Sequence, residues 1–279
     1  MSDIIPEQII DFHVHLFPDP LFKAIWDFFA QQYDWHILYK YYAPQCIDYL
    51  RSKQVSHIIY SNYAHKAGVA EGLNQWNIET LNRNSNLFCF AAFHPEDENC
   101  LQMAEKMLSH PRVIGFKLQH LVQDFYPTDE RLFPLYEMVI EKNKRILFHV
   151  GNGPASNEYV GFKNFLPLMK RYPHLPATVA HLGGYEFEPF FDLLGDHDNL
   201  MMDTTFCFFK DAEMSFSLSS DYLENNQDRL VYGSDFPNLT APRHQEIEGL
   251  QALGLSKIFY QKLFRDNGKR LLDQHCPGF

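Results

Sequence analysis

The sequence has no run of about 18 consecutive apolar residues, so no membrane-spanning helix is expected. Residues 1–6 lack the basic and apolar regions of a signal peptide. The five cysteines are odd in number and show no short pairing pattern: Cys46, Cys89, Cys100, Cys207 and Cys276. A disulfide framework is therefore not expected, and these absences together predict a cytoplasmic protein.

Positive charge is also scarce. The chain carries 24 Lys and Arg against 35 Asp and Glu, giving a net charge of −11 with histidine neutral. An acidic chain without a basic run is a poor partner for nucleic acid or for anionic lipid. A glycine-rich phosphate loop is missing after the first apolar run as well. With nucleic acid and anionic lipid disfavoured, we expect a small-molecule substrate as the binding partner.

Residues 9–18 hold the most informative stretch, Ile-Ile-Asp-Phe-His-Val-His-Leu-Phe-Pro. Alternate side chains of a β-strand share a face. His13 and His15 are therefore predicted to project together, with Asp11 on the same face and the intervening apolar residues on the other. Two neighbouring imidazoles near a strand end are half of a metal site, because zinc and similar metals take three or four nitrogen or oxygen ligands.

Short apolar segments alternate with helical patterns along the rest of the chain. After the first strand, further strands are predicted at 56–60, 87–93, 113–118, 145–150, 177–181, 199–203 and 229–233. Helices are predicted at 44–53, 69–84, 98–109, 129–142, 162–171, 187–194, 210–225, 244–253 and 256–274. Eight mostly unalternating strands separated by helices predict a (β/α)₈ barrel, formed as a single domain by residues 1–279. A doubly wound open sheet is the alternative.

Residues 16–50 are rich in aromatic side chains and are longer than a simple turn. We expect a mostly helical insertion that lies over the face of His13 and His15. Its aromatic residues either pack on the barrel or on a second copy of the chain, or line a pocket. A homodimer is compatible with the second of these arrangements.

Polar side chains fall where the barrel strands end, on the face that carries the active site of such barrels. They are His13, His15, Lys117, His149, His181 and Asp235. Imidazoles and a carboxylate form a mixed site suited to Zn²⁺, with Mn²⁺ or Fe²⁺ as alternatives. Asp235 could ligate the metal or take a proton from water, and His181 could be a further ligand or a general acid/base.

Other polar residues near this rim have less certain roles. Lys117 could bind a substrate carboxylate, be carboxylated to bridge two metals, or pair with an acid. Asp11 could orient a ligand histidine or bond to backbone. Asn152, after the fifth strand, and His65, after the second, are candidate substrate contacts.

With these residues in place, the chain resembles the amidohydrolase-related metal-dependent hydrolases, the group that also holds aminocarboxymuconate semialdehyde decarboxylase. The resemblance rests on Ile-Asp-Phe-His-Val-His at 10–15, Gly-Phe-Lys-Leu at 115–118, Phe-His-Val-Gly at 148–151, Ala-His-Leu-Gly-Gly at 180–184 and Tyr-Gly-Ser-Asp-Phe-Pro at 232–237. It implies a distorted barrel with a divalent metal held by His13, His15, His149 and Asp235. It also implies that His181 is the catalytic histidine when one metal is bound.

The resemblance leaves the reaction open. Members hydrolyse lactones, esters or amides, hydrate double bonds, or release CO₂ from unsaturated and aromatic acids. Non-oxidative decarboxylases of the group often begin with Glu-x-His, where this chain has His13 and His15. No arginine stands at an obvious strand end, although Arg243 follows the last strand, and Lys117 is the better-placed cation.

We therefore expect a metal-dependent hydrolase that uses a metal-activated water on a lactone, ester or amide. The alternative is a lyase at the same centre, either a non-oxidative decarboxylase or a hydratase of an unsaturated carboxylic acid. A barrel with a structural metal and a barrel nuclease are further alternatives, and the nuclease would want a glutamate in place of Lys117. One metal ion is favoured, and two are allowed if Lys117 is carboxylated.

Overall fold

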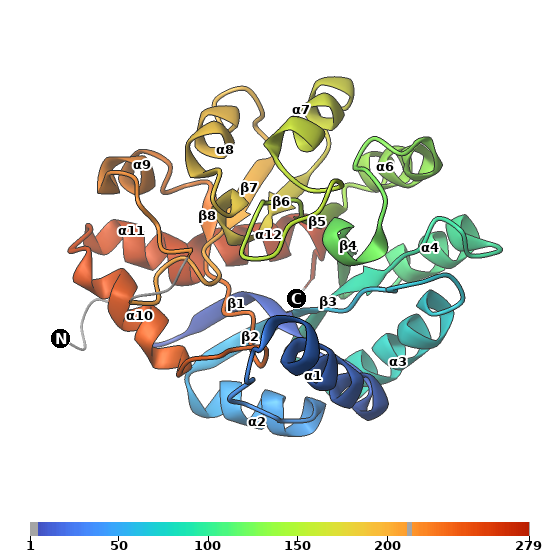
Figure 1. The fold of residues 1–279 in the computed structure, drawn as a ribbon, viewed down its shortest axis with the longest axis horizontal. Helices are drawn as coiled ribbons and strands as arrows, with labels where there is room; N and C mark the ends of the chain where they lie inside the picture. Colours follow the sequence, from blue (N-terminus) through green and yellow to red (C-terminus); the bar gives the residue numbers. More distant parts are fainter. Residues whose placement is uncertain (1–4, 211–213, 279) are drawn as a thin grey trace.

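Eight parallel strands form one sheet in the order of the sequence (Figure 1). The computed structural model describes residues 5–210 and 214–278. Its strands are β1 (Ile9–His15), β2 (Val55–Ser61), β3 (Leu87–Ala92), β4 (Val113–Gln119), β5 (Arg145–His149), β6 (Ala177–Val179), β7 (Leu200–Asp203) and β8 (Leu230–Val231). The predicted (β/α)₈ barrel is confirmed.

The barrel closes between its last and first strands through backbone contacts. The Phe12 amide donates to the Tyr232 carbonyl at 2.8 Å, and the His15 amide donates to the Phe236 carbonyl at 2.8 Å. A parallel bridge also joins Val14 to Phe236. Residues 232–236, which follow β8, therefore lie directly beside the two histidines of β1.

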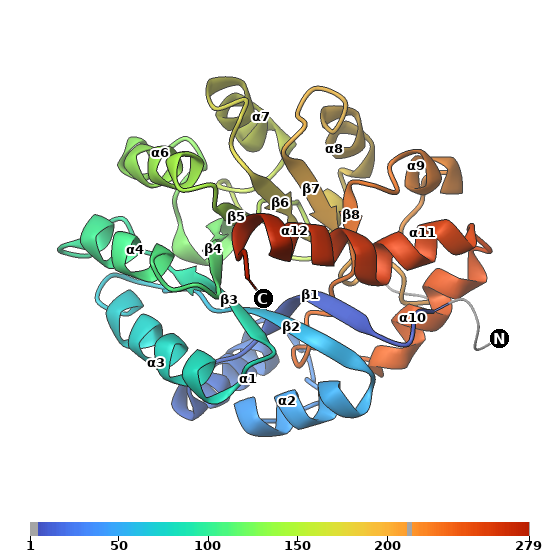
Figure 2. The ribbon, with the colours of Figure 1, turned by 180° about the vertical axis from the view of Figure 1, so that it is seen from behind.

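Helices surround the sheet (Figures 1 and 2). They are α1 (Asp19–Tyr33), α2 (Ala43–Ser52), α3 (Ala70–Arg83), α4 (Cys100–Leu108), α5 (His120–Gln123), α6 (Phe133–Glu141), α7 (Phe162–Arg171), α8 (Phe187–Leu193), α9 (Ser220–Asn225), α10 (Arg243–Ala252), α11 (Lys257–Gln261) and α12 (Asn267–His275). Short 3₁₀ segments lie at Glu130–Leu132 and Ala180–Gly183, and a π-helical turn at Lys262–Asp266 joins α11 to α12.

The predicted helix at 210–225 is wrong over most of its described length. Only Ser220–Asn225 is helical, while residues 211–213 lie outside the described part of the chain. Serine favours caps and turns over helix interiors, because its hydroxyl bonds to nearby backbone. Here the Ser219 hydroxyl accepts the Asp221 amide hydrogen at 3.3 Å and fixes the start of α9.

The apolar core has two layers. All eight strands, or residues directly next to them, contribute to an inner cluster that includes Phe12, Phe90 and Leu147 and reaches Leu271 of α12. Figure 2 shows α12 running across the strands on this side of the barrel. The larger second cluster lies between the strands and the surrounding helices. The inner cluster therefore seals one end of the barrel and leaves the opposite end for polar residues.

Strand β1 departs from the predicted alternation. Its pairing with β2 shifts register between Asp11 and Val14, as at a β-bulge. Phe12 belongs to the inner cluster, whereas Val14 belongs to the outer one, so the two do not share a face as predicted. A bulge re-aims the side chains that follow it, and Asp11 consequently points away from the histidines.

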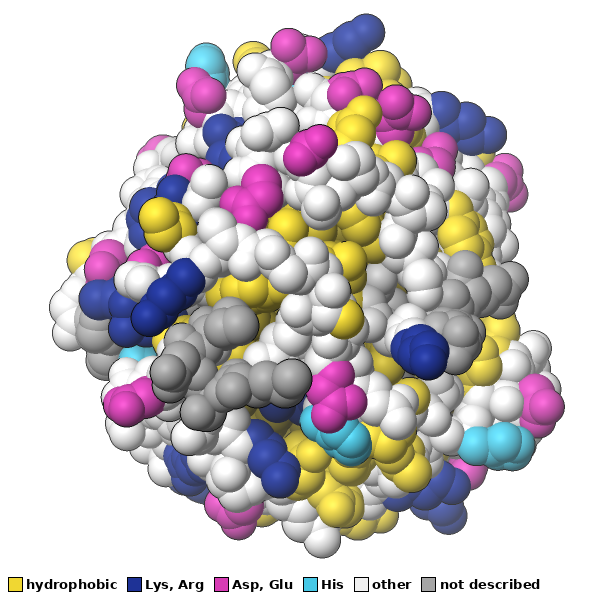
Figure 3. Space-filling model, turned by 90° about the vertical axis from the view of Figure 1, so that its left-hand side faces the viewer, with side chains coloured by type: hydrophobic (Ala, Val, Ile, Leu, Met, Phe, Trp, Pro, Cys, Tyr) yellow, Lys and Arg dark blue, Asp and Glu magenta, His cyan; other side chains and the backbone are white. Residues whose placement is uncertain are grey.

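Charged groups of both signs occur on the face drawn in Figure 3, where basic side chains lie among acidic and uncharged ones. In residues 5–210 and 214–278, no helix is long and apolar enough to cross a membrane.

We predict that Phe90→Ala lowers the free energy of unfolding by about 3–5 kcal/mol, because it opens a cavity in the fully buried inner cluster. Denaturant unfolding measures the change. Ile258→Ala is the control: that side chain is 61% exposed, and its loss should change the free energy by less than about 0.5 kcal/mol. Equal effects of the two substitutions would contradict the two-layer core.

Candidate metal centre

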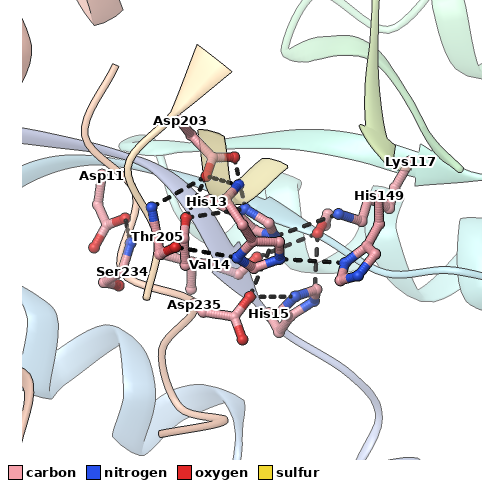
Figure 4. A network of polar contacts seen from close by, with 12 residues as sticks. Asp11, His13, Val14, His15, Lys117, His149, Asp203, Thr205, Ser234 and Asp235 are labelled. Carbon is pink, nitrogen blue, oxygen red and sulfur yellow. Dashed lines mark hydrogen bonds and ion pairs between the residues drawn. The ribbon is translucent and has the colours of Figure 1, made fainter. Parts of the chain in front are cut away.

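His13, His15 and Asp235 form a buried cluster at the open end of the barrel (Figure 4). One ligand atom from each lies within 4.8 Å of the others. Oδ1 of Asp235 is 3.0 Å from Nε2 of His15 and 3.3 Å from Nε2 of His13. Residues of the first strand and of the segment after the last strand thus converge on one point.

Asp203, at the end of β7, holds the ring of His13. The His13 Nδ1–H donates to Oδ2 of Asp203 at 2.8 Å, and both side chains are fully buried. Because an ionised carboxylate only accepts hydrogen bonds, this contact places the ring hydrogen on Nδ1. The lone pair of Nε2 is left facing Asp235 and the Lys117 amine, whose Nζ is 3.4 Å away.

Asp203 also shapes the turn after β6. Its Oδ1 accepts the backbone N–H of His181 at 2.9 Å and that of Thr205 at 3.2 Å. His181 and Leu182 have φ of 58° and 50°, in the left-handed region that non-glycine residues rarely adopt. The sequence-based prediction did not include Asp203. The signal was available, because an aspartate that ends a barrel strand meets the same positional criterion as the other candidates.

Asp235 is held from the backbone. Its own amide and that of Ser234 donate to the His13 carbonyl at 2.8 and 3.2 Å, and its φ is 57°. Asp11 contributes here, since its Oδ1 accepts the Ser234 N–H at 3.0 Å and its Oδ2 lies 3.4 Å from Arg243. Asp11 was predicted either to orient a ligand histidine or to bond to the backbone, and in the structure it bonds to the backbone.

His149 and His181 form a second pair beside the cluster. The His181 Nδ1–H donates to the Thr205 carbonyl at 3.2 Å, so Nε2 of His181 accepts the Nδ1–H of His149 at 3.2 Å. This leaves a lone pair on Nε2 of His149, a buried atom without a hydrogen-bond partner among the described residues. His149 is outside the three-residue cluster but adjoins it through His181, whose ring is 5.4 Å from that of His13.

Burial keeps these histidines neutral. Desolvation, reinforced by the Lys117 charge, lowers the pKa of His13 to about 4. It also holds the pKa of His149 well below its ordinary value and lowers that of His181. Desolvation works against Asp203 and Asp235, but the nearby histidines outweigh it and lower the pKa of both carboxyl groups. At neutral pH His13, His149 and His181 are therefore neutral and the two carboxylates are ionised, the forms that bind metals.

Lys117 of β4 is fully buried behind His13. Desolvation lowers the pKa of its amine to about 8, although Asp203 and Asp235 act in the opposite direction. A lysine with this pKa is neutral in part of the population at pH 7–8, as carboxylation by CO₂ requires.

A cavity of about 240 Å³ opens over the site. His15, His149, His181 and Asp235 lie in its wall, together with the aromatic residues Phe28, Phe29, Tyr33, Trp35, Tyr63 and Phe206. Four of these aromatic residues come from α1 and the loop after it, so part of the predicted aromatic segment lines a pocket.

The three predicted substrate contacts are not among the described residues of this wall. Lys117 is buried beneath it. Asn152 pairs with the backbone of Gly184, and its side chain accepts the Ser156 hydroxyl hydrogen. His65 is exposed after β2. The roles of these three residues in substrate binding therefore stay predictions.

The donor set fits a divalent cation. The Nε2 atoms of His13 and His15 face a carboxylate oxygen, and for His13 the contact with Asp203 leaves no hydrogen at Nε2 to bridge the gap. Acceptor atoms that face one another in a buried cluster are unfavourable unless a positive charge lies between them. Two imidazoles and a carboxylate, with the unpartnered nitrogen of His149 nearby, suit zinc or manganese.

Comparison with known proteins gives a family. An amidohydrolase family model matches residues 10–274. No curated protein sequence matches the chain. A TIM-barrel protein from Bordetella bronchiseptica superposes with a TM-score of 0.75 at 14% identity, covering 96% of this chain and 99% of that one.

Two structures with informative names share the fold. The first is 5-carboxyvanillate decarboxylase from Novosphingobium aromaticivorans, in complex with manganese and a nitrobenzoic acid; its TM-score is 0.72 at 13% identity, covering 95% of this chain and 96% of that one. The second is a probable 2-pyrone-4,6-dicarboxylic acid hydrolase from Acinetobacter baumannii with citric acid bound; its TM-score is 0.63 at 13% identity, with 95% and 98% coverage.

We predict that in Asp203→Asn the imidazole of His13 no longer has a single tautomer, because an amide can donate as well as accept a hydrogen bond. ¹⁵N NMR of histidine-labelled protein should show one Nδ1–H form of His13 in the wild type and a mixture of forms in the variant. Asp129→Asn, at the surface ion pair with Arg131, is the control and should leave the His13 signals unchanged. An unaltered His13 spectrum in Asp203→Asn would contradict this role.

Proposed function

Because the chain belongs to the amidohydrolase family, we propose that it is a metal-dependent hydrolase that cleaves a small lactone, ester or amide. The observation that carries this proposal is the convergence of the His13 and His15 nitrogens on the Asp235 carboxylate at the floor of an open cavity. His149, with its free buried nitrogen, completes the set that would hold one metal ion. Bound there, a divalent metal acidifies water and polarises a carbonyl group.

The residues of the chain supply the rest of the chemistry. Asp235 lies in the cavity wall, and one of its oxygens is free to take the proton that the attacking water loses while the other faces the histidines. His181 has its Nδ1–H fixed on the Thr205 carbonyl. Its Nε2, which here accepts the Nδ1–H of His149, is the basic atom that would take up a proton when that contact opens. Once protonated, it would stabilise the negative charge that develops on the carbonyl oxygen.

The competing reaction is that of a lyase, which the same donor set could support. The fold likeness to a manganese-containing decarboxylase favours it, although identity of 13% supports the fold alone. Release of CO₂ from unsaturated or aromatic acids, measured beside hydrolysis of a lactone and ester panel, separates the two reactions.

We predict about one zinc or manganese ion per chain in protein purified without added metal, and its loss in His15→Ala and His149→Ala. Elemental mass spectrometry measures the content. His174→Ala, which changes an exposed histidine in the loop before β6, should retain the metal. Two ions per chain would indicate a carboxylated Lys117 that bridges them, and no metal after reconstitution would overturn the proposal.

We further predict that His181→Gln keeps the metal and lowers kcat by about 10²–10³, since the Gln amide oxygen can replace Nε2 as the acceptor for His149 but cannot exchange the proton. Metal content and kcat are compared on the same preparation. A variant that loses the metal would instead make His181 a ligand, and one with wild-type kcat would remove it from the reaction.

A further inference from the structure

One side of the cavity is a continuous aromatic surface, here called the aromatic wall: Phe28, Phe29, Tyr33 and Trp35. The chain turns back after α1, and the Trp35 amide donates to the Phe29 carbonyl at 3.2 Å. This turn brings the Trp35 ring centroid to 5.6 Å from that of Phe29 and to 5.3 Å from that of Tyr33. Phe28 and Tyr33 are 45% and 36% exposed, unlike most large apolar side chains of the barrel.

Further apolar residues line the cavity. They include Leu121, Val122 and Met214, and Phe206 lies next to the metal centre, with its ring 6.1 Å from that of His181. Phe206 has φ of 64°, which is unfavourable for a bulky side chain. A flat group in this cavity would contact aromatic side chains while it reaches the metal centre.

Positive charge is absent from the described wall. Its histidines and its one carboxylate, which are His15, His149, His181 and Asp235, all belong to the metal centre, and neither lysine nor arginine is among the described residues that line it. A substrate carboxylate far from the metal would therefore meet no compensating charge.

Two buried amide groups in the wall have unused acceptors. Oε1 of Gln119 and Oδ1 of Asn238 lack a hydrogen-bond partner among the described residues. The two side chains are only 8% and 4% exposed, and both line the cavity. An unpartnered buried acceptor is unfavourable, so each is suited to a donor that a ligand brings with it.

We propose that this cavity selects an uncharged aromatic substrate that carries a hydrogen-bond donor, such as a phenolic hydroxyl, away from the reacting carbonyl. It discriminates against aromatic substrates with a carboxylate at that position. The assignment rests on the proposed function for its reacting end, but the selection itself is a property of the aromatic wall, Gln119 and Asn238.

The test is a matched ligand series, measured by isothermal titration calorimetry on the metal-loaded protein. 4-Hydroxyacetophenone, acetophenone and 4-acetylbenzoate share a ring and a ketone and differ in a hydroxyl, a hydrogen or a carboxylate at one position. We expect 4-hydroxyacetophenone to bind at least about tenfold more tightly than 4-acetylbenzoate, with acetophenone between them. Equal or tighter binding of 4-acetylbenzoate to both metal-loaded and metal-stripped protein would overturn the proposal.

Substitutions assign the selection to residues. Phe29→Ala and Trp35→Ala should weaken all neutral ligands about tenfold, whereas Trp76→Ala on α3, outside the cavity, should not. Gln119→Leu and Asn238→Leu should remove the tighter binding that the hydroxyl of 4-hydroxyacetophenone gives.

Val122→Arg should supply the missing cation and favour binding of 4-acetylbenzoate, and Val122→Gln is its uncharged control. Unchanged affinities in Phe29→Ala and Trp35→Ala, with a smaller assembly by light scattering, would make the aromatic wall a contact between copies instead.

The outcomes separate this inference from the proposed function. If the protein selects ligands as proposed but shows no metal-dependent turnover, the inference about the cavity is supported and the proposed hydrolase function is contradicted. If the protein turns over a lactone with two carboxylates, such as 2-pyrone-4,6-dicarboxylate, as fast as dihydrocoumarin, the hydrolase function is supported and the proposed selection is contradicted.

Discussion

The hydrogen bond from His13 to Asp203 is the constraint on which the site depends. It fixes the ring hydrogen on Nδ1 of His13. Nε2 therefore carries a lone pair, which faces Asp235. Asp203 also bonds the backbone of His181, and His181 in turn orients His149. One buried carboxylate therefore sets the geometry of three histidines, which come from β1, β5 and the turn after β6.

The barrel makes this arrangement possible because it excludes water at one end and admits it at the other. The inner apolar cluster and α12 close the first end. At the second end, desolvation keeps the histidines neutral, and the loops after the strands carry the residues that need irregular backbone, including Asp235 and Phe206 at positive φ. The apolar cluster that stabilises the fold and the candidate site thus lie at opposite ends of the same sheet.

The barrel and the rim residues could be predicted from the sequence, because short apolar strands with polar ends follow from local pattern. The face of Asp11 could not, since a bulge in β1 depends on how β1 pairs with β2. Substrate contacts at Lys117, Asn152 and His65 are predicted from their positions at or after strand ends. The cavity wall combines strand-end residues such as His15 and His149 with residues of α1 and of the loops, whose packing is set by long-range contacts that periodicity does not encode.

Closure of the barrel between β8 and β1 has a consequence for biosynthesis. His15 and Asp235 are separated by 220 residues, so the two sides of the cluster are made near the start and near the end of translation. A nascent chain that lacks β8 has the two histidines of β1 but neither the carboxylate nor the backbone contacts that align them. The complete cluster therefore forms only in a chain that has been synthesised past residue 236.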